Sequence, residues 1–455
     1  MKQLRYIIEP MFIFYYTGLL LQMPVIQQYI YSWYSKEYGL EYHYDTQSNS
    51  CHTGKYNSSE MALEKNVQSK VSRFYAGLAL CQNIPCIITL LFYGSLSDIV
   101  GRKPIMVVTT AMSTIYLIIS SITVWLELNI KFIYIGAFFD GLGGSYPGLV
   151  MSGTAYLADL TKKDKLSLRL AIFESAVLVS LATSFYTSGI FIAKYSFAIP
   201  EVFITCLISL SFLWALFVLK ESLNFSLPDT EKKKLNFKTI IIMPAKLLAS
   251  WKRQYVHRHA LSLVILSLSF SSIFLIPLLS LVTLYLLNSP LCFSATSNGY
   301  YIGTLLVTLS VSSALGVKLC LRFLPAPMVV LISFGFGSAY YFLLAFSHEI
   351  KLLYSGLVLR SFSLLHVPIL RSLVSSMVIT TDRGSIFSIM ACLDQIFILL
   401  LTQIFNYLYI KINQSGYFFL VPGSLYIIPS ILIIIYWVIT STKKDDKLLL
   451  IVSET

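Results

Sequence analysis

Gly94-Ser-Leu-Ser-Asp-Ile-Val-Gly-Arg-Lys-Pro104 is a short polar stretch that lies between two long apolar segments of the chain. Gly94 and Gly101 allow the backbone to turn tightly, and Pro104 is suited to the first turn of a following helix. The charged residues of this stretch would be costly inside lipid. The stretch therefore predicts a tight turn at a membrane surface, between two helices that cross the bilayer.

The composition points to a membrane protein over the whole length of the chain. Of the 455 residues, 56% are hydrophobic and only 12% are charged, whereas a soluble domain carries about 25% charged residues. Apolar runs recur that are long enough to cross a hydrocarbon core of about 30 Å. Because lipid offers no water to backbone groups, these runs are predicted to be helices.

Hydropathy predicts about twelve such spans, and so an all-α integral membrane fold. The first run begins almost at Met1, is longer than the apolar part of a signal peptide, and contains Glu9-Pro10. It is therefore predicted to be a retained first helix rather than a cleaved signal. The predicted spans are residues 7–30, 72–93, 104–125, 132–158, 168–192, 200–220, 260–286, 298–321, 327–347, 352–378, 385–410 and 417–440.

The basic residues indicate the orientation of these spans. If both termini are cytoplasmic, most of the 34 Lys and Arg fall on the cytoplasmic side, as the positive-inside rule requires. The net charge of +12 is then a consequence of topology. Nucleic-acid binding would need a basic patch with stacking aromatics on a soluble module, and the sequence has none. The expected partners are the bilayer and a small solute.

Two long polar segments divide the chain. Residues 31–71 are predicted to form an outer loop, and residues 221–259 a basic cytoplasmic loop that separates six spans from six. This division favours two pseudo-symmetric bundles. The expected domains are residues 1–220 and 260–440, joined by the central loop and followed by a cytoplasmic tail at 441–455.

The pattern G-x-L-x-D-x-x-G-R-K of the opening stretch resembles the loop between the second and third membrane helices of the major facilitator superfamily. Four further segments resemble solute carrier family 46, the proton-coupled folate transporter and its relatives, and this resemblance spans essentially the whole chain. It implies a twelve-helix secondary transporter. The four segments are Lys70-Val-Ser-Arg-Phe74, Leu284-Tyr-Leu-Leu-Asn-Ser-Pro-Leu-Cys292, Pro368-Ile-Leu-Arg-Ser372 and Thr381-Asp-Arg-Gly-Ser-Ile-Phe387.

The resemblance assigns a gating role to the opening motif, including Lys103. The superfamily's acid, here Asp98, faces the positive N-terminus of helix 11, which would lie near Gly384. Arg102 can pair with an acid at the end of helix 4, where Asp159 is well placed. These contacts would hold the two halves together when the binding site faces outward. The alternative is a solvated loop that only follows the positive-inside rule.

Charged residues inside spans are the candidates for transport chemistry. Glu174 matches an acid that the folate-carrying relative uses for proton coupling, and a carboxyl group in low-dielectric surroundings holds a proton more readily than in water. The alternative is a structural ion pair. Arg371 matches a family arginine linked to substrate and proton binding. Arg360 lies 11 residues earlier and would share its helix face, which favours an anionic solute. The alternative is that one or both are buried against helix neighbours.

Other polar residues of the spans are weaker candidates for substrate contacts. Asp140 precedes a run of glycines that permits close helix packing, so it either lines a cavity or lies in a packing seam. Ser145 stands where the folate-carrying relative has an acid, and residues 261–285 lack that relative's histidine. Neither folate nor the same proton relay is therefore assumed. Gln22 is a further candidate, while His366 is expected to be a buried core residue.

The outer loops carry two expected modifications. Cys51 and Cys292 both lie on the oxidising side and are expected to form a disulfide, with two free thiols as the alternative. Asn57 begins a glycosylation sequon in the first outer loop. The remaining five cysteines lie in or near spans and are expected to be packing residues.

The expected function is therefore secondary transport of a small organic anion by alternating access, with proton symport as the energy source. The sequence has none of the H-E-x-x-H, G-x-S-x-G or G-x-x-x-x-G-K-[ST] motifs of enzymes, and no cofactor or metal is expected. The rival is a transporter-like membrane sensor or scaffold without flux. Asp445-Asp-Lys-Leu-Leu-Leu450 fits a dileucine sorting signal, so both the plasma membrane and the endolysosomal membrane stay open.

Overall fold

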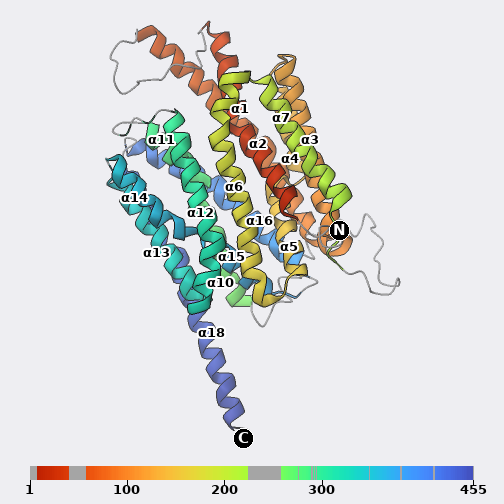
Figure 1. The fold of residues 1–455 in the computed structure, drawn as a ribbon, viewed down its shortest axis with the longest axis vertical. Coiled ribbons are helices and arrows are strands. Elements are labelled where there is room, and N and C mark those ends of the chain that lie inside the picture. Colours follow the sequence, from red (N-terminus) through yellow and green to blue (C-terminus); the bar gives the residue numbers. More distant parts are fainter. Residues whose placement is uncertain are drawn as a thin grey trace.

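The protein is an elongated bundle of long helices that run side by side (Figure 1). Cys51, Asn57 and Cys292 lie outside the described residues, so the predicted disulfide and glycan stay predictions. The computed structural model describes residues 8–39, 58–223, 258–274, 276–287, 291, 293, 295–347, 349–379, 382–412 and 416–453.

The helices fall into two groups along the chain, here called the N-terminal half (residues 8–223) and the C-terminal half (residues 258–453). The first group comprises α1 (Glu9–Glu37), α2 (Ser58–Val100), α3 (Arg102–Trp125), α4 (Phe132–Leu142), α5 (Ser145–Leu160), α6 (Lys163–Tyr195), α7 (Ala198–Leu213) and the π-turn η2 (Trp214–Val218).

The second group ends in α18, which extends well beyond the rest of the bundle (Figure 1). It comprises α10 (Arg258–Ser271), η5 (Ser272–Phe274), α11 (Ile276–Leu287), α12 (Ala295–Phe323), α13 (Ala326–Ala345), α14 (Ile350–Ser361), η6 (Phe362–Leu364), α15 (His366–Met377), α16 (Arg383–Lys411), η8 (Gly416–Phe419), α17 (Leu420–Leu425) and α18 (Ile427–Ser453).

Nine helical segments of the described part are long and apolar enough to cross a membrane. The predicted spans 7–30, 132–158 and 260–286 are not among these nine, so the count of twelve is met only in part. The outer surface of the bundle is apolar: the side chains of Phe217 and Phe323 are 76% and 72% exposed. Lipid tails can cover such a surface without cost, whereas water cannot.

Glycine breaks the predicted span 132–158 into α4 and α5. Gly144 has φ +80° and Ser145 has φ +44°, a left-handed conformation that interrupts a right-handed helix. Gly141 serves the packing role expected of this run, because a Cβ atom there would collide with the backbone of Gln82. The same short run therefore supplies both a close helix contact and a helix break.

Proline accounts for the interruption of the predicted span 352–378. Pro368 has no N–H to bond the carbonyl of the residue four positions earlier, and its ring crowds that position. The chain forms the 3₁₀ turn Phe362–Leu364 directly before α15. Arg360 and Arg371 consequently lie on two different helices. The expectation that they share one helix face is wrong.

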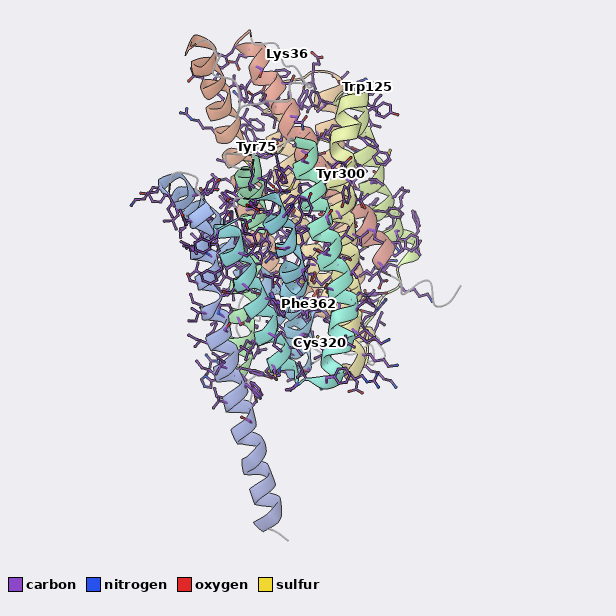
Figure 2. All side chains as sticks on the ribbon, turned by 60° about the vertical axis from the view of Figure 1, so that its left-hand side comes forward. Lys36, Tyr75, Trp125, Tyr300, Cys320 and Phe362 are labelled. Atoms are coloured by element: carbon purple, nitrogen blue, oxygen red, sulfur yellow. The ribbon has the colours of Figure 1, made fainter. Side chains whose placement is uncertain are left out.

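Contacts between the two halves define the arrangement of the bundle. α6 packs along α12 and α2 along α16, while α5 contacts α16 and α15 contacts α6. Lys36 and Trp125 mark one end of the helices and Cys320 lies toward the other (Figure 2). We call the end that carries the α2–α3 junction the motif end, and the end with Lys36 and Trp125 the opposite end.

Candidate functional site

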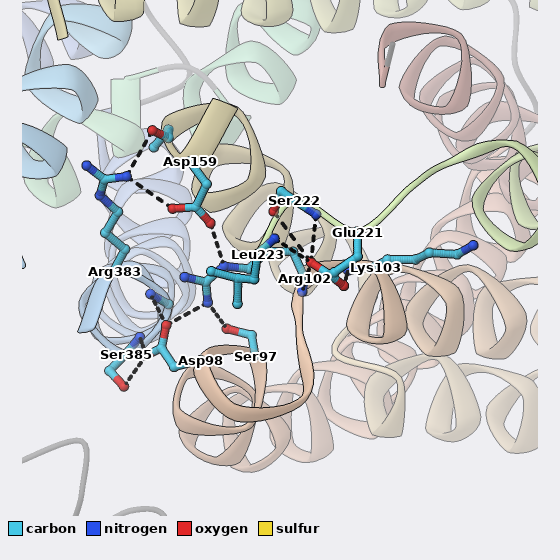
Figure 3. Close-up of polar contacts among 12 residues, drawn as sticks. Ser97, Asp98, Arg102, Lys103, Asp159, Glu221, Ser222, Leu223, Arg383 and Ser385 are labelled. Atoms are coloured by element: carbon cyan, nitrogen blue, oxygen red, sulfur yellow. Dashed lines mark hydrogen bonds and ion pairs between the residues drawn. The ribbon is translucent and has the colours of Figure 1, made fainter. Parts of the chain in front are cut away.

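Asp98, in the last turn of α2, contacts the first turn of α16 at the motif end (Figure 3). One carboxylate oxygen accepts the Gly384 N–H at 2.9 Å, and the other accepts the N–H and hydroxyl of Ser385 at 2.9 and 2.8 Å. The free N–H groups of a helix N-terminus carry a partial positive charge. This carboxylate therefore joins the N-terminal half to the C-terminal half.

Two arginines and a second acid complete this cluster. Arg102, which is fully buried, donates to Asp98 at 2.6 Å and to Asp159 at 3.1 Å. Arg383 of α16 donates to the other oxygen of Asp159 at 3.1 Å and to the Ala158 carbonyl at 2.9 Å. We call Asp98, Arg102, Asp159 and Arg383 the latch. It balances two carboxylates with two guanidinium groups.

Glycines let the backbones of the latch approach closely. A Cβ atom on Gly94 would meet Ser388 of α16, and one on Gly384 would meet the side chains of Ser97, Arg102 and Asp98. Gly101 has φ +114°, a conformation that side-chain-bearing residues rarely adopt. Gly101 thus makes the turn that the motif predicts. Gly94 lies within α2, so the expectation that it also forms a tight turn is wrong, and it serves a close contact between the halves instead.

Glu221, at the end of the N-terminal half, is a residue that the sequence reasoning missed. Its two carboxylate oxygens accept the backbone N–H groups of Arg102 at 2.9 Å and Lys103 at 3.0 Å. These are free donors at the start of α3, where a negative charge is favourable. The side chain of Lys103 donates to the Leu216 carbonyl at 2.9 Å. Glu221 therefore caps the start of α3 and stabilises the turn between α2 and α3.

Glu174 and Arg371 form a second connection between the halves. Glu174 lies on α6 and Arg371 on α15, and the guanidinium donates to the carboxylate. The side chains are 14% and 12% exposed. Neither interpretation of Glu174 excludes the other, because the candidate proton-coupling acid is also one partner of an ion pair.

Asp394 of α16 is a further acid beside this pair. Arg371 interacts electrostatically with Asp394 and with Tyr16 of α1, and the Ser269 hydroxyl lies next to Asp394. We call Glu174, Arg371, Asp394 and Tyr16 the central cluster. The rule that charged residues inside spans are functional candidates would have found Asp394, which was overlooked in the predicted span 385–410.

Asp140 and Ser145 lie in a packing seam of the N-terminal half. Asp140 is fully buried and accepts hydrogen bonds from Ser113 of α3 and, at 2.7 Å, from Gln82 of α2. Gln82 also donates to Ser145 at 3.3 Å, and Tyr15 of α1 bonds Ser113 at 3.0 Å. Asp140 thus lies in a packing seam between helices and does not line a cavity.

Arg360 is enclosed by aromatic rings of the C-terminal half. It is 4% exposed, donates to the Phe274 carbonyl at 2.7 Å and the Tyr426 hydroxyl at 3.3 Å, and stacks over Tyr340 and Tyr341 at 5.3 and 5.2 Å. In the described part of the chain no carboxylate pairs with it. It lies apart from the central cluster.

Two other sequence candidates are also buried within one half. Gln22 of α1 donates to Ser120 of α3 at 3.1 Å. His366 bonds the Ser333 hydroxyl at 3.1 Å and the Ser363 carbonyl at 2.9 Å, as expected of a core histidine. Over the residues that the structure describes, no group of three His, Cys, Asp or Glu side chains could hold a metal ion.

A cavity of about 530 Å³ lies away from both clusters, at the opposite end, between α1, α2 and the start of α4. Its lining includes Trp33, Tyr134, Glu37 and Lys70. Lys70 donates to Glu37 at 2.9 Å, and this carboxylate raises the pKa of the Lys70 ammonium. The pair is well exposed, and exposed pairs contribute little to stability.

Comparisons with known proteins agree on one fold and one class of proteins. The family model described as Major Facilitator Superfamily matches residues 10–402. The lysosomal proton-coupled steroid conjugate and bile acid symporter SLC46A3 of Gallus gallus is 26% identical over 463 residues, which cover 98% of this chain and 97% of the relative. The proton-coupled folate transporter of Bos taurus is 25% identical over 433 residues, which cover 93% and 90%.

Solved structures match over almost the whole chain. The human organic anion transporter MFSD10 superposes with a TM-score of 0.69 at 15% identity, covering 95% of this chain and 99% of the other. The fucose:proton symporter FucP of E. coli gives a TM-score of 0.65 at 14% identity, with the same coverage. At these identities the match shows the fold alone.

Proposed function

This chain belongs to the major facilitator superfamily, with relatives in solute carrier family 46, and we propose that it is a secondary active transporter. It moves a small organic anion across the membrane by alternating access, coupled to proton symport. The observation that carries this proposal is the central cluster, in which Arg371 of one half pairs with Glu174 of the other beside Asp394.

The charges of the central cluster explain how a proton would be used. One guanidinium faces two carboxylates, so the cluster keeps one net negative charge when both acids are ionised. A single proton neutralises it. Protonation of Glu174 removes its ion pair with Arg371, because the neutral acid no longer attracts the guanidinium strongly. The connection between α6 and α15 then weakens.

The freed Arg371 is the proposed binding group for the solute. A guanidinium binds a planar carboxylate, sulfate or phosphate with two parallel hydrogen bonds. The proton and the anion therefore act on the same ion pair: one neutralises Glu174, and the other replaces it at Arg371. The two relatives are a steroid conjugate and bile acid symporter and a folate transporter, and organic anions of that size are the proposed class.

The latch is the proposed gate at the motif end, which we place in the cytoplasm together with both termini. Asp98, Arg102, Asp159 and Arg383 close this end, with Gly94 and Gly101 allowing the close approach and Lys103 held at the motif turn. In the described conformation, release of substrate on this side requires the latch to open. We propose an endolysosomal or plasma membrane, where an acidic outer side supplies protons.

The remaining sequence candidates would act indirectly. Asp140, Ser145 and Gln22 hold helices of the N-terminal half together, and Arg360 holds α14 against η5 and α17–α18. Their proposed role is to keep Glu174 and Arg371 at a fixed separation. Substitutions there are expected to change stability before they change solute preference.

The deciding experiment uses the full chain in liposomes with an inward proton gradient. A bile acid, a steroid sulfate and folate are the probes. Accumulation of at least one probe with the gradient, and its loss in Glu174→Gln, would support the proposal. The matched control is Asp164→Asn, which removes an exposed acid at the start of the same helix. If no probe moves under any gradient, the sensor or scaffold alternative is favoured.

A further inference from the structure

Glu201 is a buried acid that the proposed transport cycle does not use. It lies in the first turn of α7, and its side chain has no exposure to solvent. Neither carboxyl oxygen receives a well-aligned hydrogen bond, although the side chains of Gln22 and Ser120 lie close enough to interact with it. A buried polar group without partners is unusual, because it has lost its bonds to water and gained none in return.

The neighbours of Glu201 suggest how it is accommodated. Its carboxyl group lies beside Gln22 of α1 and Ser120 of α3. The Gln22 amide nitrogen donates to the Ser120 hydroxyl at 3.1 Å, whereas the Gln22 amide oxygen also lacks a donor. One buried contact therefore contains two groups of acceptor oxygens, those of Glu201 and of the Gln22 amide, without a well-aligned donor.

The ionisable groups around Glu201 supply no positive charge. The phenols of Tyr29 on α1, Tyr75 on α2 and Tyr116 on α3 interact with it electrostatically. Within the described residues, no lysine or arginine does so. Glu127 and Asp140 act on Tyr29 and Tyr116 respectively, and both would add negative charge to the surroundings.

The balance of effects favours a neutral acid. The N-terminus of α7 favours an anion, but such an effect amounts to at most about 30-fold in an equilibrium. Burying an unpaired carboxylate disfavours the charged form by roughly a thousandfold or more. The helix N-terminus therefore cannot compensate for burial without a cation.

We propose that Glu201 is a second proton-binding site, which keeps its proton throughout the transport cycle. The Glu201 O–H donates to the Gln22 amide oxygen, and its other oxygen accepts the Ser120 hydroxyl. Together with the bond from Gln22 to Ser120, these close a ring of three hydrogen bonds. The ring satisfies both carboxyl oxygens of Glu201 and the amide oxygen of Gln22, and it fastens α7 to α1 and α3.

This proton is distinct from the coupling proton at Glu174. All members of the ring belong to the N-terminal half, whereas the Glu174–Arg371 pair joins both halves. The backbone of Glu201 is also fixed, since its carbonyl accepts the hydroxyls of Ser121 at 3.0 Å and Thr205 at 2.9 Å. Rigid-body movement of one half against the other leaves such a ring unchanged.

Infrared spectroscopy of the full chain in liposomes at neutral pH tests the proposal. The wild type should show a carbonyl band of a protonated carboxylic acid that disappears in Glu201→Gln. The band should persist in Glu37→Gln, which removes an exposed acid of the same end of the bundle. A band that is absent in the wild type, or unchanged by Glu201→Gln, would overturn the proposal.

A second variant keeps the test decisive if Glu201→Gln does not fold. Gln22→Leu leaves the acid in place but removes its acceptor, so the band should shift to the frequency of a less strongly bonded acid. An unshifted band would contradict the ring. Glu201→Gln, when folded, should keep gradient-driven uptake of the same probes within about twofold of the wild type. Loss of the gradient dependence would instead assign the coupling proton to Glu201.

Discussion

The latch and the central cluster both join the two halves through arginines and acids, but they differ in charge balance. In the latch, two guanidinium groups face two carboxylates, and backbone N–H groups of α16 add further donors. In the central cluster, one guanidinium serves two carboxylates. The latch is therefore satisfied without a proton, whereas the central cluster is left with a negative charge that one proton can neutralise.

The latch and the central cluster also differ in how much of their side chains is exposed. The latch side chains are between 0% and 9% exposed, whereas those of Arg371 and Glu174 are 12% and 14% exposed. The comparison indicates that a balanced and more buried set of charges can act as a gate, while an unbalanced and slightly more exposed set can act as a coupling site.

Replacement of Arg371 by Ala should have the largest effect. It leaves two carboxylates without a cation and removes two hydrogen bonds from the guanidinium to the anion, each worth about 1.5–3 kcal/mol, which together correspond to roughly a hundredfold or more in binding. Proton-driven uptake in liposomes should fall by at least that factor, and Arg371→Lys should retain part of it. Wild-type uptake in Arg371→Ala would show that the central cluster is not the coupling site.

Asp98→Asn should change the latch more moderately. It keeps the size of the side chain but weakens hydrogen bonds to Arg102, Gly384 and Ser385, and bonds to charged groups contribute about 1.5–3 kcal/mol. We expect a ten- to hundredfold shift toward a conformation open at the motif end. The measurement is thiol labelling of Cys392, which is buried in the structure, in a single-cysteine background.

The control for the latch test is Asp164→Asn, at an exposed acid of the same end. It should leave the labelling rate of Cys392 unchanged. Equal labelling in the Asp98→Asn variant and the wild type would contradict a gating role for Asp98.

Asp394→Asn should make the central cluster resemble the latch. One carboxylate would then face one guanidinium, so the Glu174–Arg371 pair would be balanced without a proton. We expect uptake to fall by about tenfold, equivalent to about 1.4 kcal/mol, and to depend less on the proton gradient. Uptake measured at acidic and at neutral pH tests both the lower rate and the weaker dependence on the gradient. A variant with the full gradient dependence would exclude Asp394 from the cluster's charge balance.

Glu221→Ala should have the smallest effect of the four. It removes the acceptor of two N–H groups at the start of α3, and losing such a cap costs about 1 kcal/mol. The melting temperature in detergent should fall slightly. It should fall less in Glu221→Gln, because glutamine keeps an acceptor oxygen. If Glu221→Ala increased the labelling of Cys392 as much as Asp98→Asn does, Glu221 would belong to the latch itself.

Much of the fold was predictable because it depends on local chemistry. Apolar runs of sufficient length predicted most of the spans, and the opening motif predicted that Asp98 faces the region of Gly384. Its carboxylate indeed accepts the Gly384 N–H. The family resemblance based on residues 94–104 and four other segments is confirmed by the comparisons.

The candidate site was less predictable because it depends on which helices meet. Helical periodicity placed Arg360 and Arg371 on one face, but the turn before Pro368 separates them. The sequence allows Asp140 to line a cavity or to lie in a packing seam, and its bonds to Ser113 and Gln82 decide for the seam. Glu221 carries no sequence signal of its role, since its partners lie more than 100 residues away.

The sequence by itself determined the membrane class and the turn at Gly101, because hydropathy and turn chemistry act over short stretches of chain, and the motif at residues 94–104 indicated the superfamily by its resemblance. Only the tertiary structure decided that Asp98 also shares its charge with Arg102, that Arg383 joins Asp159, and that Arg371 pairs with Glu174 near Asp394. Charge balance is a property of groups brought together from distant helices. No single stretch of sequence contains it.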